Sequence, residues 1–448
     1  MKTDLIIIGS GPGGYTMAFD AASQGLAVTI FENDKLGGTC LNRGCIPTKT
    51  LCQNASIIER IKESSLYGIE IDGFKFDFSR MMARKNDIVS QLQDGIGMLL
   101  KHPNINLIHG EAEIIEDRKV KCGDEIYLCD NLVIATGSEP KFLPIEGAHC
   151  STVLTSDEIL NLAELPHKLT IIGGGVIGME FACIFNSLGV EVSVVEFCKE
   201  ILPTLDSDVA KRLRQALTKK GIAINVNSQV KGIKELDGKT QVLFEQKGKE
   251  LSLETDIVLM AVGRAPRFPK GLDKIGVDYS GKGIKTDDSM QTNIRHTYAI
   301  GDVNGRCMLA HAATFQGKRA LNAIYSVSDD IMLDIMPAAV FTQPEASSVG
   351  LTEDQCKADG IDFVAKKSFF RSNGKAMAMN DTDGIIKLIA TKDNGIILGC
   401  HILGPHAADL IQEVTTIMNK KGTVYDLRAC IHAHPTLGET LEMAADQF

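Results

Sequence analysis

Two cysteines, Cys40 and Cys45, stand five positions apart in a stretch that also carries three glycines. A disulfide needs its two Cα atoms within about 4.4–6.8 Å, and residues five apart on a regular helix lie somewhat too far apart and point in different directions. Gly37, Gly38 and Gly44 allow the bent backbone that would bring the two sulfurs together. The pair therefore has the spacing of a dithiol that can open and close.

Pro47 and Lys49 follow the second cysteine directly. Proline fits the first turn of a helix, and the positive end of that helix would face Cys45 and favour the thiolate over the thiol. The alternative is a structural disulfide, but closing so short a loop contributes only about 2 kcal/mol, and an intracellular chain rarely keeps such a bond oxidised. We therefore favour a redox-active dithiol.

The composition of the 448 residues is that of an ordinary globular protein, and the length predicts two to four domains. A net charge of −10 without a basic cluster argues against a nucleic-acid or anionic-membrane partner. No apolar run approaches the roughly 20 residues of a membrane span, and the short run before Gly9 is too short for a signal peptide. The twelve cysteines are otherwise scattered, which predicts a reducing compartment; we expect the cytoplasm, with an organelle matrix left open. No spacing is typical of metal ligands.

A glycine-rich motif lies near the N-terminus. Leu5–Ile8 predicts a buried parallel strand, which leads into the G-x-G-x-x-G pattern of residues 9–14 and a helix over 15–24. The next strand, 27–31, ends at Glu32. Glycines let the backbone approach a pyrophosphate, the helix N-terminus attracts its charge, and Glu32 can accept hydrogen bonds from a ribose.

The same pattern occurs a second time, from the strand 169–172 through the glycines of 173–178 to Glu196. The first glycine and the acid are 23 positions apart in both copies, which predicts two dinucleotide sites rather than two ordinary glycine turns. Glu196 would repel a 2′-phosphate, and only Lys199 is basic among the next four residues, so NAD is favoured over NADP.

The chain after Ala338 has a different pattern. Strand candidates at 363–370, 385–390 and 396–403 precede a helix over 406–420, which predicts a separate α+β domain. Near the end, His434 with Glu439 has the residue types of a tuned general base, although from the residues alone a satisfied histidine is the simpler interpretation. Asp302, just after a short apolar strand, is either a ligand-binding acid or a helix cap.

The sequence thus predicts an α/β fold with two Rossmann-like dinucleotide-binding domains and a C-terminal α+β domain. The expected divisions are a first nucleotide domain over 1–143, a second over 144–263, a continuation of the first over 264–337, and the last domain over 338–448.

Taken in this order, these elements resemble the pyridine nucleotide–disulfide oxidoreductases, and most closely those members that oxidise dihydrolipoamide. The resemblance covers essentially the whole chain. Its most specific segments are 38–49, 135–138, 173–180, 308–311 and 432–436.

The resemblance implies FAD at the first motif and NAD at the second. The matching FAD positions are Gly9, Gly11, Gly14, Glu32, Lys49, Ala112, Thr136, Gly137, Ser138, Asp302, Met308, Leu309, Ala310 and His311. The matching NAD positions are Gly173, Gly175, Gly178, Glu180, Glu196, Val230 and Gly263. Glu180 resembles the acid that pairs with Lys49 beneath the nicotinamide.

By the same resemblance the last domain is a homodimer interface that delivers His434, oriented by Glu439, into the partner's active site. The substrate dithiol would lose a proton to this histidine and attack Cys40, releasing Cys45 as a thiolate, and electrons would then pass through FAD to NAD⁺. The catalytic set implied is Cys40, Cys45, Lys49, His434 and Glu439.

The implied partner is a lipoyl-bearing protein of a 2-oxo acid dehydrogenase or glycine cleavage complex. Residues 312–317 and Thr48 depart from the pattern of many lipoamide-type members, so an NADH-dependent reductase of another low-molecular-weight disulfide is the alternative. A docking subunit without catalysis is an alternative of another class, but it would have no need of the cysteine pair.

Overall fold

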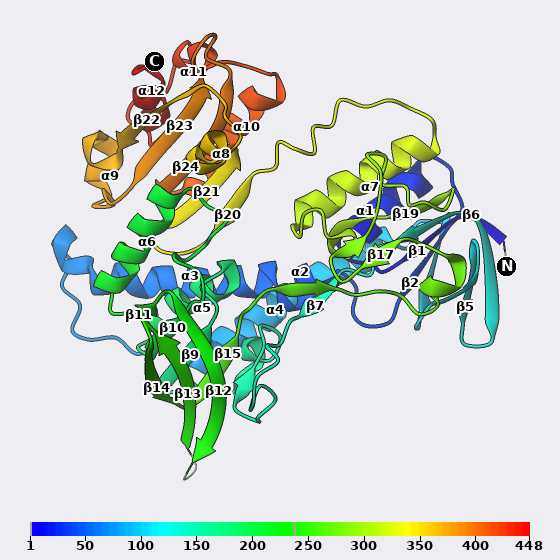
Figure 1. The fold of residues 1–448 in the computed structure, drawn as a ribbon, viewed down its shortest axis with the longest axis horizontal. Coiled ribbons are helices and arrows are strands. Elements are labelled where there is room, and N and C mark those ends of the chain that lie inside the picture. Colours follow the sequence, from blue (N-terminus) through cyan, green and yellow to red (C-terminus); the bar gives the residue numbers. More distant parts are fainter. Residues whose placement is uncertain (1, 237–238) are drawn as a thin grey trace. The chain divides into compact units, whose positions relative to one another are not determined.

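The computed structural model describes residues 2–236 and 239–448, which form two compact units (Figure 1). The first unit comprises the residues up to Thr50, Asp77–Lys141 and Gly263–Leu333. The second comprises Leu51–Phe76, Phe142–Val262 and Asp334–Phe448. This partition does not test the four-part division expected from the sequence, which stays a prediction.

A seven-stranded sheet organises the first unit. Its parallel strands run in the order β3-β2-β1-β6, with β19 also paired to β6, and two antiparallel strands extend it. In β1, Leu5 and Ile7 belong to the core beneath the helices, whereas Ile6 and Ile8 belong to the core on the other face. A strand covered on both faces is apolar throughout, which explains the continuous run seen in the sequence.

The elements of this unit have the following bounds. The strands are β1 (Lys2–Ile8), β2 (Val28–Glu32), β3 (Ile105–His109), β4 (Glu113–Glu116), β5 (Lys119–Cys122), β6 (Glu125–Ile134), β7 (Ser138–Pro140), β16 (Arg264–Pro266), β17 (Tyr279–Ser280), β18 (Gly283–Ile284) and β19 (Thr297–Ala299). The helices are α1 (Pro12–Ser23), α2 (Gly38–Arg43), α4 (Phe78–Leu99) and α7 (Ala310–Ile324), and α3 (Cys45–Lys62) begins here and ends in the second unit.

The second unit contains a parallel sheet of the same winding. Its strand order is β11-β10-β9-β15-β8. The strand before the glycines, β9, lies between β10 and β15, as β1 lies between β2 and β6 in the first unit. The bounds are β8 (Val153–Leu154), β9 (Lys168–Ile172), β10 (Glu191–Val195), β11 (Ala223–Asn225) and β15 (Ile257–Met260), with α5 (Val176–Ser187) and α6 (Ser207–Lys219).

An antiparallel sheet that the sequence analysis did not predict packs on this part of the second unit. It consists of β12 (Ser228–Leu236), β13 (Lys239–Gln246) and β14 (Lys249–Thr255). Val242 and Phe244 alternate with more exposed residues along β13 and join Ile172 and Val195 in one core. The spacing of Val242 and Phe244, two positions apart, is typical of one face of a strand, and sequence analysis could have used it.

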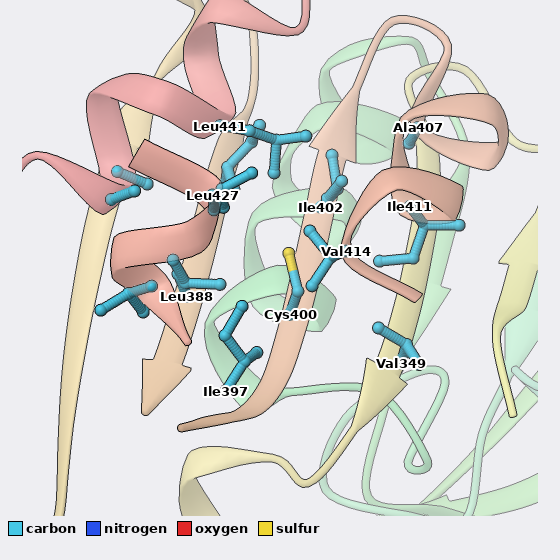
Figure 2. Close-up of a cluster of buried hydrophobic side chains, with 14 of the residues drawn as sticks. Val349, Leu388, Ile397, Cys400, Ile402, Ala407, Ile411, Val414, Leu427 and Leu441 are labelled. Carbon is cyan, nitrogen blue, oxygen red and sulfur yellow. The ribbon is translucent and has the colours of Figure 1, made fainter. Parts of the chain in front are cut away.

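The C-terminal part of the second unit is a five-stranded antiparallel sheet with helices packed on it. The strands are β20 (Ala338–Val340), β21 (Glu345–Gly350), β22 (Phe363–Phe369), β23 (Ile385–Thr391) and β24 (Ile397–Gly404), and the helices are α8 (Glu353–Ala358), α9 (Gly374–Ala378), α10 (Ala407–Asn419), α11 (Val424–Arg428) and α12 (Glu439–Ala445). Figure 2 shows Cys400 and Ile402 of β24 facing Val414 of α10 and Leu427 of α11. The three predicted strands and the helix are confirmed, whereas β20 and the serine-containing β21 were missed.

Within the described residues, no helix combines the length and the apolar character needed to cross a membrane.

Candidate active site

The first glycine motif forms a tight turn between β1 and α1. Gly9 has φ +107°, and a Cβ there would lie 2.4 Å from the carbonyl oxygen of Ala135. A Cβ on Gly14 would lie 2.0 Å from the carbonyl oxygen of Gly9, whereas one on Gly11 would meet nothing within 4 Å. The backbone at Gly11 is therefore open at the N-terminus of α1, which no side chain caps. A pyrophosphate fits such an opening, because the free N–H groups and the helix dipole both attract it.

Glu32 closes this motif at the end of β2. Its Oε2 accepts hydrogen bonds from the amide and the hydroxyl of Ser10, at 2.9 and 2.6 Å, and its Oε1 accepts one from the amide of Asp34 at 2.8 Å. The carboxylate is buried and held beside the glycine turn. The carboxylate, as an acceptor for ribose hydroxyls, and the open glycine, beside the pyrophosphate, together fit a dinucleotide.

The second motif repeats this local structure in the second unit. Gly173 also has φ +107°, and its Cβ would lie 2.4 Å from the carbonyl oxygen of Ala261. Gly175 is open, and a Cβ on Gly178 would collide with the carbonyl oxygen of Gly173. Glu196 accepts hydrogen bonds from the amides of Gly174 and Cys198, each at 2.5 Å. The two motifs thus build the same local structure, with glycines at matching positions and a glutamate at the end of each.

The remaining predicted FAD residues of the first unit follow strands of one parallel sheet. Ala112 lies just after β3, Thr136 just after β6, and Asp302 just after β19. Because the carboxyl ends of parallel strands share one edge, these residues gather at the edge that carries the glycine turn.

Ser138 and Asp302 are in direct contact at this edge. The Ser138 hydroxyl lies 2.5 Å from Asp302 Oδ2, and Arg264 donates to the Ser138 hydroxyl and carbonyl, each at 2.8 Å. Burial raises the pKa of Asp302, while the bond from Ser138 and the charge of Arg264 oppose that rise. Arg264 also lies 3.4 Å from the hydroxyl of Thr39, so it connects the cysteine segment to this edge.

The predicted segment 308–311 leads into α7. Leu309 is the N-cap, and Ala310 and His311 are the first helical residues, following the partly exposed Met308. Behind them Gln316 accepts hydrogen bonds from the amide of Gly301 and the side chain of Asn304, at 2.7 and 2.9 Å.

Arg264 and Gln316 were both missed as site residues. Arg264 follows Gly263, for which an NAD contact is predicted, and no motif points to the arginine itself. Gln316 belongs to residues 312–317, which depart from the pattern of many lipoamide-type members, so the resemblance assigns it no role.

The cysteine segment is two short helices interrupted at one glycine. Cys40 lies in α2 and Cys45 is the first residue of α3, with Gly44 between the helices. A Cβ on Gly44 would lie 2.9 Å from the carbonyl oxygen of Thr39, so the chain bends where a side chain would not fit. The bend brings the two thiols into hydrogen-bond contact.

The environment of the two thiols is asymmetric. The hydrogen bond with Cys45 and burial raise the pKa of Cys40, and the nearby Lys49 opposes the rise. Cys45 occupies the N-terminal end of α3, where the helix dipole favours negative charge. The arrangement keeps the proton on Cys40 and favours a thiolate at Cys45.

The glycine before this segment is packed against the first nucleotide turn. The amide of Gly37 donates to the carbonyl of Ser10 at 3.0 Å, and a Cβ on Gly38 would lie 2.7 Å from the Cα of Gly11. The segment of the dithiol and the dinucleotide cradle are therefore in direct backbone contact.

His434 and Glu439 form a pair at the start of α12. His434 Nδ1 lies 2.8 Å from Glu439 Oε1, and Glu439 Oε2 accepts from the amide of Thr436 at 2.8 Å. These two bonds lower the pKa of Glu439, the bond with His434 most. The imidazole is 80 % exposed, so it is oriented by the carboxylate and faces outward.

The other predicted NAD residues lie in different settings. Glu180 is buried in α5 and accepts from the amide of Phe341 at 3.0 Å, and Val230 is a core residue of β12. Gly263 lies between the end of β15 at Met260 and the start of β16 at Arg264. Lys49 lies in the first unit and Glu180 in the second, so their pairing stays a prediction.

Residues 3–317 match the family model of the pyridine nucleotide-disulphide oxidoreductases, and residues 336–445 match the dimerisation domain of that family. The chain therefore belongs to the pyridine nucleotide-disulphide oxidoreductase family. It is similar to the dihydrolipoyl dehydrogenase of Bacillus subtilis (strain 168), with 40% identity covering 100% of this chain and 96% of the relative. The dihydrolipoyl dehydrogenase of Geobacillus stearothermophilus is 38% identical, with the same coverage of both chains.

Among solved structures, the HOCl-induced flavoprotein disulfide reductase RclA from Escherichia coli superimposes with a TM-score of 0.88 at 30% identity, covering 99% of each chain. These comparisons confirm the predicted fold class and family. FAD and NAD are accordingly the cofactors, and the dimerisation domain supports a homodimer.

Proposed function

We propose that this protein is an NAD-dependent dihydrolipoyl dehydrogenase, which oxidises dihydrolipoamide to lipoamide and reduces NAD⁺ to NADH. The observation that carries the proposal is the asymmetric pair Cys40 and Cys45, in a segment whose backbone packs against the first nucleotide cradle. Full-length similarity to dihydrolipoyl dehydrogenases supports the substrate.

The first cradle, with Glu32, would hold FAD, and the second, with Glu196, would hold NAD. When bound, FAD supplies a two-electron carrier between the cysteine pair and NAD⁺. If NAD binds at this cradle, Glu196 would hold its ribose, and the carboxylate would repel the extra phosphate of NADP.

The cysteine pair would exchange with the substrate through the sulfur of Cys40. In the oxidised pair, a substrate thiolate attacks the Cys40 sulfur, the Cys40–Cys45 bond breaks, and Cys45 leaves as a thiolate stabilised by the end of α3. The second substrate sulfur then attacks the first, which closes the lipoamide disulfide and releases Cys40. Two electrons have then moved from the substrate to the cysteine pair.

His434 of the partner subunit would act as the base for the substrate thiol. Its Nδ1 faces Glu439, which leaves Nε2 to take the proton. Glu439 would fix the tautomer and the direction of the ring, as a carboxylate does for a catalytic histidine.

The finer assignments follow from this function. The partner would be a lipoyl-bearing protein of a 2-oxo acid dehydrogenase or glycine cleavage complex, and the compartment would be the cytoplasm, which keeps scattered cysteines reduced. Reduction of another low-molecular-weight disulfide by NADH is the second candidate, favoured by the likeness to a flavoprotein disulfide reductase.

The test is NADH-linked turnover with dihydrolipoamide, compared with NADH oxidation by glutathione disulfide and related small disulfides. We expect dihydrolipoamide to be the preferred substrate, and the Cys45→Ser variant to lose its turnover while retaining FAD. The matched control is Cys430→Ser, an exposed thiol that donates to the carbonyl of Asp426 and that serine can replace in this bond. Faster turnover of another disulfide would favour the second candidate, and full activity of Cys45→Ser would refute the dithiol role.

A further inference from the structure

A second histidine, His432, precedes His434 by two positions and lies in a different environment. Its Nε2 is 2.9 Å from Glu413 Oε1, and its Nδ1 is 3.4 Å from Glu442 Oε2 and 3.2 Å from the carbonyl oxygen of Cys430. The ring is only 8 % exposed, against 80 % for His434. One histidine is held between acceptors, and the other faces outward.

The space that holds the ring of His432 is shaped for it. A Cβ on Gly438 would lie 3.0 Å from Cδ2 of His432, closer than side chains normally pack. Gly438 is the N-cap of α12, directly before Glu439. The imidazole therefore fills the place of a missing side chain beside the carboxylate that orients His434.

The two acidic partners are carried by helices that the core fixes. Glu413 lies on α10 between Ile411 and Val414, and Glu442 follows Leu441 on α12. Figure 2 shows these three apolar side chains in one buried cluster. Both helices that carry the acidic partners of His432 are therefore anchored in the core.

The segment between α11 and α12 has no regular structure of its own. Its end toward α12 is held by Asn373, which donates to the carbonyl of Thr436 at 2.9 Å, and by Glu439, which accepts from the amide of Thr436. Its other end is held by the contacts of His432. His434 lies between these two anchors.

We infer that His432 is a positioning residue for the dithiol half-reaction. It ties the segment 430–438 to Glu413 and Glu442 and so restricts His434 to the directions in which its imidazole can reach the substrate thiol. A base that must act across a subunit boundary gains from such restriction, because misplacement by about 1 Å can cost about 100-fold in rate. The inference rests on the proposed role of His434.

The test compares His432→Leu, which removes both ring nitrogens, with Glu413→Gln and Glu413→Leu in the FAD-loaded dimer. Gln keeps an oxygen acceptor for the imidazole, whereas Leu has a similar volume and keeps none. The control is His406→Asn, an exposed histidine whose left-handed backbone (φ 53°) asparagine adopts readily.

Two measurements are made on each variant. Hydrogen–deuterium exchange of the peptide spanning 430–438 reports the order of the segment without any turnover. The second is the rate of cysteine-pair reduction by dihydrolipoamide, set against hydride transfer between NADH and the flavin in the same preparation.

We expect His432→Leu and Glu413→Leu to exchange faster in 430–438 and to slow the dithiol half-reaction about 10- to 100-fold, with hydride transfer unchanged. Glu413→Gln and His406→Asn should remain close to the parent in both measurements. Unchanged exchange in both Leu variants, or an equal loss in both half-reactions, would overturn the inference. If His434→Gln keeps the full dithiol rate, the proposed role of His434 as the base is wrong. That failure can be told apart from a failure of the inference about His432, because hydrogen–deuterium exchange of 430–438 is measured without turnover.

Discussion

Gly38 and Gly11 meet so closely that a Cβ on Gly38 would lie 2.7 Å from the Cα of Gly11. One glycine begins the helix of the cysteine segment, and the other is the N-cap of the first nucleotide helix. The contact makes the position of the dithiol depend on the backbone that would bind the FAD pyrophosphate.

Replacing Gly38 by alanine should therefore loosen FAD and destabilise the protein. Gly38 has φ +58°, which costs about 1–2 kcal/mol for a residue with a Cβ, and the collision with Gly11 adds to that cost. The measurements are the flavin absorbance per chain after gel filtration and the free energy of unfolding in urea. Gly95→Ala is the control, because Gly95 lies on an exposed part of α4 with open space around it, where alanine should stabilise by about 0.5–1 kcal/mol. Equal FAD retention in both variants would contradict the prediction.

The pair of His434 and Glu439 should govern only one half-reaction. His434→Gln removes the base, so we expect reduction of the cysteine pair by dihydrolipoamide to slow about 100- to 10,000-fold. Hydride transfer between NADH and the flavin should be unaffected, which stopped-flow absorbance can resolve. Adding Glu439→Gln to His434→Gln should cost little more, since the carboxylate acts through the ring. A large additional loss would mean that Glu439 has a separate role.

Glu196 should determine the choice between NAD and NADP. Glu196→Gln removes the charge that disfavours a 2′-phosphate but keeps an acceptor for the amide of Gly174 or Cys198. We expect the ratio of kcat/KM for NAD⁺ to that for NADP⁺ to fall about tenfold. Glu191→Gln is the control, because Glu191 begins β10, the strand that Glu196 directly follows, and its carboxylate is exposed beside Lys168. If Glu196→Gln leaves this ratio unchanged, the charge of Glu196 does not determine the preference for NAD⁺ over NADP⁺.

Lys387 should be the most costly charge to remove from the second unit. Its side chain is 1 % exposed in β23, and Nζ lies 2.9 Å from Asp206 Oδ1, 2.8 Å from Asp208 Oδ2 and 2.5 Å from Glu353 Oε2. Lys387→Met leaves these carboxylates without their shared cation, so we expect a loss of about 3–5 kcal/mol in the free energy of unfolding at pH 7. Lys392→Met, which breaks only an exposed pair with Asp362, should change it by less than about 1 kcal/mol.

The same cluster predicts a pH dependence of stability. Burial alone would raise the pKa of Asp208, but hydrogen bonds from Lys367 and Lys387 lower it from 3.8 to about 2, and bonds from Lys357 and Lys387 lower the pKa of Glu353. A carboxyl group with a depressed folded pKa contributes stability above its unfolded pKa and loses it as the pH falls through the folded value. The parent should therefore lose stability between about pH 4 and 2, and Lys387→Met should lose less over that window, as urea unfolding at a series of pH values would show. An equally steep loss in Lys387→Met would contradict the assignment.

The sequence by itself determined the fold class, the two nucleotide-binding motifs and the redox pair. Residues 5–8 and 169–172 are apolar except for the buried Thr170, because their strands are covered on both faces. The glycines follow these strands because only a residue without a Cβ fits the turns that the structure shows. These features depend on neighbours close in the chain, so residue type and spacing suffice to predict them.

Only the tertiary structure decided which distant residues support these motifs. Arg264 reaches Thr39 and Ser138, Gln316 supports the loop of Asp302, and His432 lies between Glu413 and Glu442. The short strands β20 and β21 exist because β24 pairs with β21, and their own residues give little signal. Each of these features rests on a contact between segments far apart in the chain, and such contacts are set by packing and hydrogen bonding that no local pattern encodes.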